Sequence, residues 1–180
     1  APINAGTYWV EAYAPETSST ASATSQAVRF HIEKAPLCIR AKDKTITYGE
    51  TLSDNGAEIN GFVNNENETV LSGLNYAFGY AQFSDIGTYT IIPMDAQAEN
   101  YKITYENGVL TVQPKPVEIK WNSESLFYYD GTPKLVTAEA IGAVNGDALT
   151  VIIEDGSRTE IGSYTARAVA LAGNKARNYV

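Results

Sequence analysis

The sequence predicts an all-β protein made of tandem Ig-like β-sandwich repeats. Apolar and polar residues alternate with period two along most segments, glycine- and asparagine-rich turn signals separate those segments, and helical periodicity is nearly absent. The 12 Tyr and 14 Gly among 180 residues fit strands and turns. The alternative is a β-grasp-like unit with one short helix per repeat, placed after Tyr48 or Tyr129.

Three copies of one short phrase indicate internal repeats. Residues 4–8, 85–89 and 160–164 each read polar residue, apolar residue, Gly, Thr or Ser, and Tyr. We call this the glycine phrase. Its glycine permits a positive φ or a close backbone approach at a strand entrance, and its tyrosine hydroxyl is predicted to bond back to the turn.

Further motifs recur with the glycine phrase. Tyr48-Gly49 is matched by Tyr129-Asp130-Gly131, and residues 61–64 are matched by residues 142–145. An Asn-Tyr step follows the second and third phrases, and its two copies are Asn100-Tyr101 and Asn178-Tyr179. The spacing of these motifs gives a repeat of about 80 residues.

The motifs divide the chain into three segments. Residues 1–34 are predicted to be the C-terminal part of a first β repeat, residues 35–115 a complete repeat, and residues 116–180 a third repeat that lacks its last strand. A missing strand would leave an unpaired edge, which folded proteins cover or charge, so we expect the protein to continue or another segment to fill the gap. Prolines at 36, 114 and 116 are expected to stiffen the joints between repeats.

Period-two alternation assigns the individual strands in chain order. In residues 37–41, Leu37, Ile39 and Ala41 share one face of the expected strand, while Cys38 and Arg40 lie on the other. Residues 105–108 predict a hairpin, residues 17–26 a long hairpin, and residues 95–99 a helix of a turn or two. The same alternation holds in residues 28–32, 103–105, 110–112 and 117–121.

The complete repeat carries a family resemblance. Residues 35–50, with the glycine phrase at 85–89, the Asn-Tyr step at 100–101 and residues 108–112, resemble the MBG domain of the YGX type. The third segment is similar to the related YDG-type repeat, through residues 127–133, 144–147 and 161–164. The first segment is similar to the tail of bacterial Ig-like repeats, through residues 4–8 and 30–35.

Such repeats occur in tandem in large secreted or surface-attached bacterial proteins. The resemblance therefore implies an extracellular stalk, spacer or adhesion module, with neighbouring repeats of the same chain as partners. Glycans or proteins of a host or cell surface are the expected external partners, and the resemblance implies no particular ligand.

The composition excludes several classes of function. With 13 Lys and Arg against 21 Asp and Glu, the net charge of −8 disfavours nucleic acid as a partner, because polyanion binding relies on a basic stripe. The sequence contains no apolar stretch of about 20 residues, so it predicts no membrane insertion. One Cys and one His exclude an internal disulfide framework and a Cys/His-rich zinc site.

The residue inventory predicts no enzyme, with no catalytic residue, cofactor or metal site. His31 lies in an alternating strand, where a half-exposed histidine is favoured over a general base. Cys38 follows seven residues later, but its alternation places it on the solvent side of a strand with no orienting Asn or Asp nearby, so a Cys–His dyad is disfavoured. The oxygen-rich loop 64–68 lacks the fixed spacing of a calcium loop and is interpreted as a solvated turn.

Aromatic residues support an alternative function. Trp9, Tyr13, Trp121, Tyr128 and Tyr129 are candidates for stacking on sugar rings in a carbohydrate- or protein-binding module. In strand-rich proteins most such side chains are cross-strand packing partners, so this function ranks second. The sequence assigns no ligand-binding residue.

Overall fold

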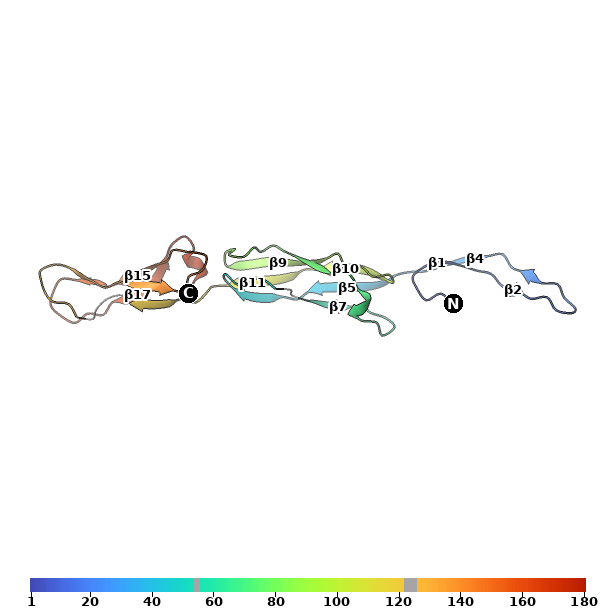
Figure 1. Cartoon of the computed structure of the whole chain (residues 1–180), viewed down its shortest axis with the longest axis horizontal. Coiled ribbons are helices and arrows are strands. Elements are labelled where there is room, and N and C mark those ends of the chain that lie inside the picture. Colours follow the sequence, from blue (N-terminus) through green and yellow to red (C-terminus); the bar gives the residue numbers. More distant parts are fainter. Residues whose placement is uncertain (54–55, 122–125) are drawn as a thin grey trace. The chain divides into compact units, whose positions relative to one another are not determined.

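The computed structural model describes residues 1–53, 56–121 and 126–180, and these residues form strands with two 3-10 helices of three residues each. The all-β, sandwich-like fold predicted from the sequence is confirmed (Figure 1). The strands are β1 (Gly6–Val10), β2 (Tyr13–Ala14), β3 (Ala23–Thr24), β4 (Val28–Ile32), β5 (Ala35–Ala41), β6 (Lys44–Thr47), β7 (Ala57–Asn60), β8 (Asn75–Phe78), β9 (Gly87–Met94), β10 (Tyr101–Glu106), β11 (Gly108–Gln113), β12 (Glu118–Trp121), β13 (Lys134–Leu135), β14 (Ala138–Ile141), β15 (Thr150–Glu154), β16 (Ser157–Arg158) and β17 (Arg167–Ala172).

The chain forms two compact units, each assembled from separate stretches of sequence. Unit 1 contains Ala1–Lys42, Asn55–Ala77 and Ile91–Gly108. Unit 2 contains Asp43–Asp54, Phe78–Thr90 and Val109–Val180. Each unit therefore combines part of the middle repeat with part of a neighbouring repeat.

The middle repeat contributes two sheets. In the first, the strand order is β10-β5-β7, and Figure 1 shows these three strands side by side; β5 runs parallel to β10 and antiparallel to β7. In the second, the order is β6-β11-β9-β8, with β6 and β11 parallel. Both parallel pairs join a strand from the start of the repeat to a strand from its end.

The hairpin predicted at residues 105–108 is wrong. Strands β10 and β11 on either side of Asn107 belong to different sheets and do not pair with each other. The chain changes sheet at Gly108, where an added Cβ would lie 2.6 Å from the carbonyl oxygen of Ala41. Only glycine fits this close backbone approach. Because Asn-Gly is also typical of hairpin turns, the sequence pattern alone does not distinguish a hairpin from a change of sheet.

The buried side chains follow the predicted alternation. In β5, Leu37, Ile39 and Ala41 are buried, Cys38 is half-buried and Arg40 is exposed. The three buried residues of β5, together with Ile91 and Tyr101, belong to the buried hydrophobic core of unit 1. The buried hydrophobic residues of unit 2 are Ile46, Tyr48, Leu110, Val112, Val151 and Tyr179.

The first repeat segment is an antiparallel ribbon. Strand β1 pairs with β4, and Tyr8 stacks on its cross-strand partner Phe30 with ring centroids 5.6 Å apart. Beyond them β2 pairs with β3, and a bridge joins Thr17 to Thr20, so the predicted long hairpin is present.

The third repeat segment contains three antiparallel pairs, β12–β14, β13–β16 and β15–β17. A parallel bridge joins Lys115 to Tyr179 near the second Asn-Tyr step. The third glycine phrase, residues 160–164, precedes β17 and is not itself in a strand.

The helices do not lie where the sequence places them. Residues 95–99 form no helix: Asp95 has φ of 63°, and the backbone of Gln97 bridges to that of Ser72. The two 3-10 helices are η1 (Glu68–Val70), which follows the cap residue Asn67, and η2 (Ala176–Asn178). Residues 49–53 and 130–133 carry no helix, so the positions suggested for the β-grasp alternative are wrong.

Candidate functional site

The first Asn-Tyr step docks on the first glycine phrase, within unit 1. The backbone amide of Ala5 donates to Asn100 Oδ1 at 2.9 Å, and Asn100 Nδ2 donates to Asn4 Oδ1 at 3.2 Å. Asn4 Nδ2 in turn donates to Glu99 Oε1 at 3.3 Å. Because a carboxamide carries both a donor and an acceptor, Asn100 contacts the phrase's backbone and its leading side chain at once. We call this arrangement joint 1.

The second Asn-Tyr step docks in the same way on the second glycine phrase, within unit 2. The amide of Ile86 donates to Asn178 Oδ1 at 3.0 Å, and Asn178 Nδ2 donates to Asp85 Oδ1 at 2.8 Å. Asp85 also accepts hydrogen bonds from Lys175 Nζ at 2.8 Å and Arg177 Nη2 at 2.5 Å. Asn178 is fully buried. We call this arrangement joint 2.

The tyrosine of the glycine phrase holds the turn on which each asparagine docks. Tyr8 donates its hydroxyl to the carbonyl of Asn4 at 2.8 Å, and Tyr89 donates to the carbonyl of Asp85 at 2.6 Å. The predicted bond from tyrosine to turn is therefore present in both joints. In the third phrase, the ring of Tyr164 lies 5.2 Å from the guanidinium carbon of Arg158.

The tyrosine of each Asn-Tyr step binds a loop of its own repeat. Tyr101 donates to Glu66 Oε2 at 2.5 Å and accepts from the amide of Val63 at 3.0 Å. Tyr179 repeats this pattern, donating to Asp147 Oδ2 at 2.6 Å and accepting from the amide of Val144 at 3.1 Å. In each joint the asparagine therefore binds the glycine phrase of the preceding repeat, whereas the tyrosine binds a loop of its own repeat.

The backbone carbonyl of each asparagine also accepts a hydrogen bond at the junction between its own repeat and the preceding one. The carbonyl of Asn100 accepts from the amide of Ala35 at 2.9 Å, and the carbonyl of Asn178 accepts from the amide of Lys115 at 2.8 Å. Lys115 also accepts from the amide of Val180 at 3.0 Å, which extends the parallel pairing. Each joint thus binds the residues that connect one repeat to the next.

Joint 2 has an aromatic contact beside its polar core. Tyr48 is buried, packs edge-on against Tyr179 with centroids 5.4 Å apart, and donates its hydroxyl to Asp147 Oδ2 at 2.9 Å. The next residue, Gly49, has φ of 88°, and a Cβ there would lie 2.8 Å from Val144 Cγ2. The paired Tyr48-Gly49 motif therefore supplies both a packing surface and close access to the neighbouring loop.

The joint changes the proton affinity of its members. Hydrogen bonds from Asn178 and Lys175, reinforced by the charge of Arg177, lower the pKa of Asp85 to about 2. The same carboxylate raises the pKa of Lys175. Burial, followed by the hydrogen bond to Asp147, raises the pKa of Tyr179 to about 12. These shifts favour charged Asp85 and neutral Tyr179 in the folded joint.

The structure places His31 and Cys38 in different sheets. His31 in β4 contacts Thr7 Oγ1 through Nδ1 at 3.0 Å, and its Nε2 lies 3.4 Å from Glu33 Oε1. Cys38 in β5 stands opposite Thr104 of β10 and Asn60 of β7. His31 therefore contacts Thr7 and Glu33 within the first repeat segment.

The oxygen-rich loop is occupied by internal hydrogen bonds. Glu66 accepts from Tyr101, and Asn67 Oδ1 accepts from the amide of Thr69 at 3.0 Å, which caps η1. Within residues 1–53, 56–121 and 126–180, no group of three or more His, Cys, Asp or Glu side chains is arranged to hold a metal ion. In the same part of the chain, no helix has the length and apolar character needed to cross a membrane.

The candidate aromatic residues are divided between the two units. Trp9 and Tyr13 belong to unit 1, whereas Trp121, Tyr128 and Tyr129 belong to unit 2, and all five are exposed. Tyr128 and Tyr129 are exposed by 81% and 65%. These two tyrosines line a cavity of about 680 Å³, together with Leu126, Phe127, Ile161 and Tyr164.

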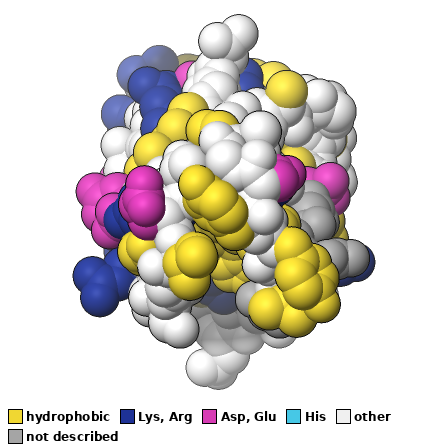
Figure 2. Space-filling model, turned by 90° about the vertical axis from the view of Figure 1, so that its left-hand side faces the viewer, with side chains coloured by type: hydrophobic (Ala, Val, Ile, Leu, Met, Phe, Trp, Pro, Cys, Tyr) yellow, Lys and Arg dark blue, Asp and Glu magenta, His cyan; other side chains and the backbone are white. Residues whose placement is uncertain are grey.

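Figure 2 views the molecule from the side of Figure 1 where the loops beside β15 and β17 lie. Hydrophobic side chains gather in the middle of this face, and acidic and basic side chains lie toward its edges. Apolar side chains are therefore exposed on this face.

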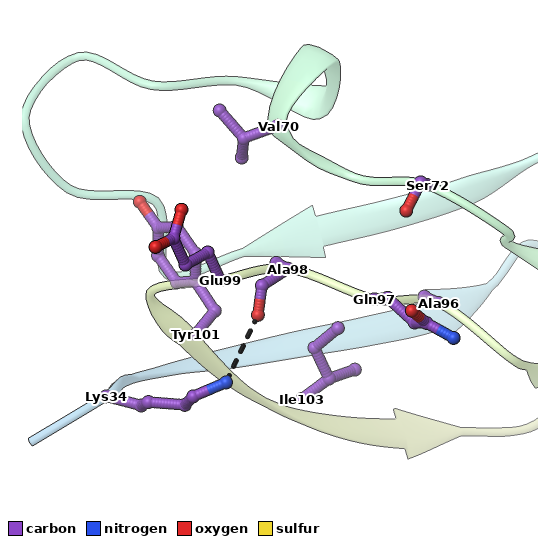
Figure 3. Close-up of a pocket in the computed structure, with 9 residues that line it drawn as sticks. All are labelled: Lys34, Val70, Ser72, Ala96, Gln97, Ala98, Glu99, Tyr101 and Ile103. Carbon is purple, nitrogen blue, oxygen red and sulfur yellow. Dashed lines mark hydrogen bonds between the residues drawn. The ribbon is translucent and has the colours of Figure 1, made fainter. Parts of the chain in front are cut away.

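A second cavity, of about 530 Å³, lies beside joint 1 in unit 1. Its lining includes Glu99 and Tyr101 on either side of Asn100. Figure 3 shows Lys34 reaching toward the carbonyl of Ala98, to which its Nζ donates at 3.4 Å. The lysine therefore fastens the segment that carries the Asn-Tyr step.

The sequence did not predict the docking role of Asn100 and Asn178. The available signal was their recurrence immediately before a tyrosine, in step with the recurrence of the glycine phrase. Recurrence identified both motifs, but it did not indicate that the asparagine of one repeat binds the phrase of the previous repeat.

Comparison with known proteins supports the resemblance of the middle repeat. No curated protein and no solved structure matches the chain significantly. Residues 37–111, which contain the second glycine phrase and the first Asn-Tyr step, match the family model of the MBG domain (YGX type), and this match confirms the resemblance of the middle repeat to that domain.

Proposed function

We propose that this chain is a non-catalytic, extracellular repeat segment of a bacterial surface or secreted protein, and that it acts as a stalk or spacer. The observation that carries the proposal is the construction of joint 2, in which the buried Asn178 binds the second glycine phrase. The MBG domain at residues 37–111 supports a repeat module of surface proteins.

The contacts of the joints support a mechanical role. A flexible linker leaves adjacent domains free to reorient, because few contacts cross it. Here the Asn-Tyr step binds both the preceding glycine phrase and a loop of its own repeat, through Asn178 on one side and Tyr179 on the other. Such fastening at successive joints is suited to limiting the bending of a tandem array.

Fluorescence energy transfer between single dye pairs tests this role. Cysteines replace the exposed residues Thr51 and Glu139 on the two sides of joint 2, in a chain whose native Cys38 is changed to Ser. We expect one narrow distribution of transfer efficiency, which broadens in Asn178→Ala. The matched control is Asn174→Ala, which changes an exposed asparagine near the same 3-10 helix. A distribution as broad in the parent as in Asn178→Ala would overturn the spacer function.

The exposed tyrosines favour a second candidate function, a carbohydrate- or protein-binding module that makes the segment adhesive. Tyr128 and Tyr129 offer two exposed rings beside a cavity, and aromatic rings of this kind stack on apolar faces of sugars. A glycan array probed with the full chain tests it. Saturable binding lost in Tyr128→Ala and Tyr129→Ala, and kept in Trp9→Ala, is the expected result; no saturable binding to any glycan contradicts the carbohydrate form of this function.

A further inference from the structure

The two joints share their asparagine but differ in charge. In joint 1 the residue before the asparagine is Glu99, and it accepts a hydrogen bond from Asn4. In joint 2 the corresponding residue is Arg177, and it donates to Asp85. Asn4 and Asp85 occupy the same first position of the glycine phrase, so a change on one side of the joint accompanies a complementary change on the other.

We propose that these two positions select which repeats can dock together, an inference that rests on the proposed spacer function. A glycine phrase that begins with Asn accepts an Asn-Tyr step preceded by an acidic residue. A phrase that begins with Asp accepts a step preceded by a basic residue. The kind of partner is therefore a repeat of the same type, chosen by the charge beside its asparagine.

The chemistry of the leading residue explains the selection. Asn4 uses its Nδ2 donor for Glu99 and its Oδ1 acceptor for Asn100, so both halves of the carboxamide have partners. An ionised aspartate has two acceptors and no donor. Asp85 is satisfied by donors alone, since Oδ1 accepts from Lys175 and Oδ2 accepts from Arg177.

The mismatched combinations would lose these contacts. Glu99 opposite an aspartate would bring two carboxylates together with no donor between them, and like charges across an interface suppress wrong partners. Arg177 opposite Asn4 would find a neutral carboxamide whose oxygen already accepts from the docking asparagine. Matched pairs thus differ from mismatched pairs in two ways: their charges do not repel each other, and each hydrogen-bond donor has an acceptor.

The common part of the joint provides affinity without selection. The amides of Ala5 and Ile86 donate to the asparagine Oδ1 in both joints, at 2.9 and 3.0 Å. The side chain of Arg177 is 64% exposed, and ion pairs of that exposure contribute little net stability. The docking asparagine therefore stabilises the joint, while the exposed residue before it discriminates between partners.

Transplanting the pair of joint 1 into joint 2 of the full chain tests the selector. The readout is hydrogen exchange of the Ile86 amide, because this amide donates directly to Asn178. We expect Arg177→Glu to lower its protection about five- to tenfold, more than Arg177→Ala, because the new carboxylate faces Asp85. Adding Asp85→Asn to Arg177→Glu recreates the Asn–Glu pair and is expected to restore protection to within about twofold of the parent.

The reverse transplant in joint 1 provides an independent arm. Asn4→Asp alone faces Glu99 and should lower protection of the Ala5 amide, and adding Glu99→Arg should restore it. The losses in both single variants should shrink at high salt, since charges of this exposure are screened. The selector is overturned if either double variant is no better protected than the single variant with facing carboxylates. A narrow energy-transfer distribution in the parent together with failed rescue would reject the selector alone and leave the spacer function standing.

Discussion

Asn178 Nδ2 donates to Asp85 Oδ1 at 2.8 Å, joining residues that lie 93 positions apart in the sequence. The same asparagine accepts from the amide of Ile86 through its side chain and from the amide of Lys115 through its carbonyl. One residue therefore connects the second glycine phrase, the inter-repeat junction and the third repeat. Its equivalent, Asn100, makes the corresponding three contacts in joint 1.

Removing the buried side chain of Asn178 is expected to destabilise unit 2 by about 2 to 3 kcal/mol, because the part-buried amide of Ile86 loses its acceptor and Asp85 loses a donor. Asn100→Ala should cost less, about 1 kcal/mol, since Asn100 is only half-buried. Urea denaturation of the full chain measures both. The exposed Asn174→Ala should leave stability unchanged, and equal costs for Asn174→Ala and Asn178→Ala would contradict the role of the joint.

The hydroxyl of Tyr89 is expected to stabilise the docking turn by about 1 kcal/mol, through its hydrogen bond to the carbonyl of Asp85. Tyr89→Phe removes this bond and keeps the ring, so thermal denaturation isolates the hydroxyl. The same substitution at the exposed Tyr128 is the control and should change stability by less than about 0.5 kcal/mol. Two indistinguishable melting curves for Tyr89→Phe and the parent would show that the bond is dispensable.

Local patterns in the sequence predicted the strands and the tyrosine bonds, but not the sheet pairing. Alternation at Leu37, Ile39 and Ala41 specifies one buried face, because a strand's side chains alternate whatever its neighbour is. The turn signal at Asn107-Gly108 specifies a reversal-prone backbone and is equally compatible with a change of sheet. The parallel pairing of β5 with β10 depends on contacts between distant segments, which local periodicity does not encode.

The candidate joints were predictable in part. Recurrence of the glycine phrase revealed a turn held by Tyr8 or Tyr89, since the hydroxyl and its acceptor carbonyl lie four residues apart. The docking of Asn178 on that turn bridges two repeats and leaves no local signature. The alternation of charge between Glu99 and Arg177 becomes meaningful only when their partners Asn4 and Asp85 are known.

Acid should weaken joint 2 through Asp85. Its pKa falls from an ordinary value near 3.8 to about 2 in the folded protein, so ionised Asp85 stabilises the joint. This contribution is fully present above about pH 4 and is lost as the pH falls toward 2. Denaturation midpoints measured across this range should show a steeper acid loss in the parent than in Asp85→Asn. Parallel pH profiles for the two proteins would contradict the assignment.

Alkali should weaken the same joint through Tyr179. The folded-state pKa is raised from 10.0 to about 12, so folding favours the neutral phenol. Its contribution is fully present below about pH 10 and is lost as the pH rises toward 12. Ultraviolet titration should detect tyrosinate formation that coincides with loss of structure. Tyr179→Phe should flatten this part of the stability profile, and an unchanged alkaline profile would exclude Tyr179 as its source.

Gly61 is expected to be the less replaceable of two equivalent glycines. It has φ of 116°, and an added Cβ would lie 2.4 Å from the carbonyl oxygen of Pro36, so the backbone must move to admit alanine. Its counterpart Gly142 has φ of 104°, but there the nearest atom, the oxygen of Pro116, is 4.0 Å away. Both alanine variants therefore carry positive-φ strain, of about 1 kcal/mol or more, and only Gly61→Ala adds a clash.

Chemical denaturation of the two alanine variants separates the clash from the strain. We expect Gly61→Ala to lose about 1 to 3 kcal/mol more than Gly142→Ala, because overpacking against fixed backbone costs that amount. The exchange rate of the Val63 amide, which donates to Tyr101, gives a local readout of the same site. If Gly142→Ala is as damaging as Gly61→Ala, the difference in backbone approach does not govern stability, and positive φ alone accounts for both glycines.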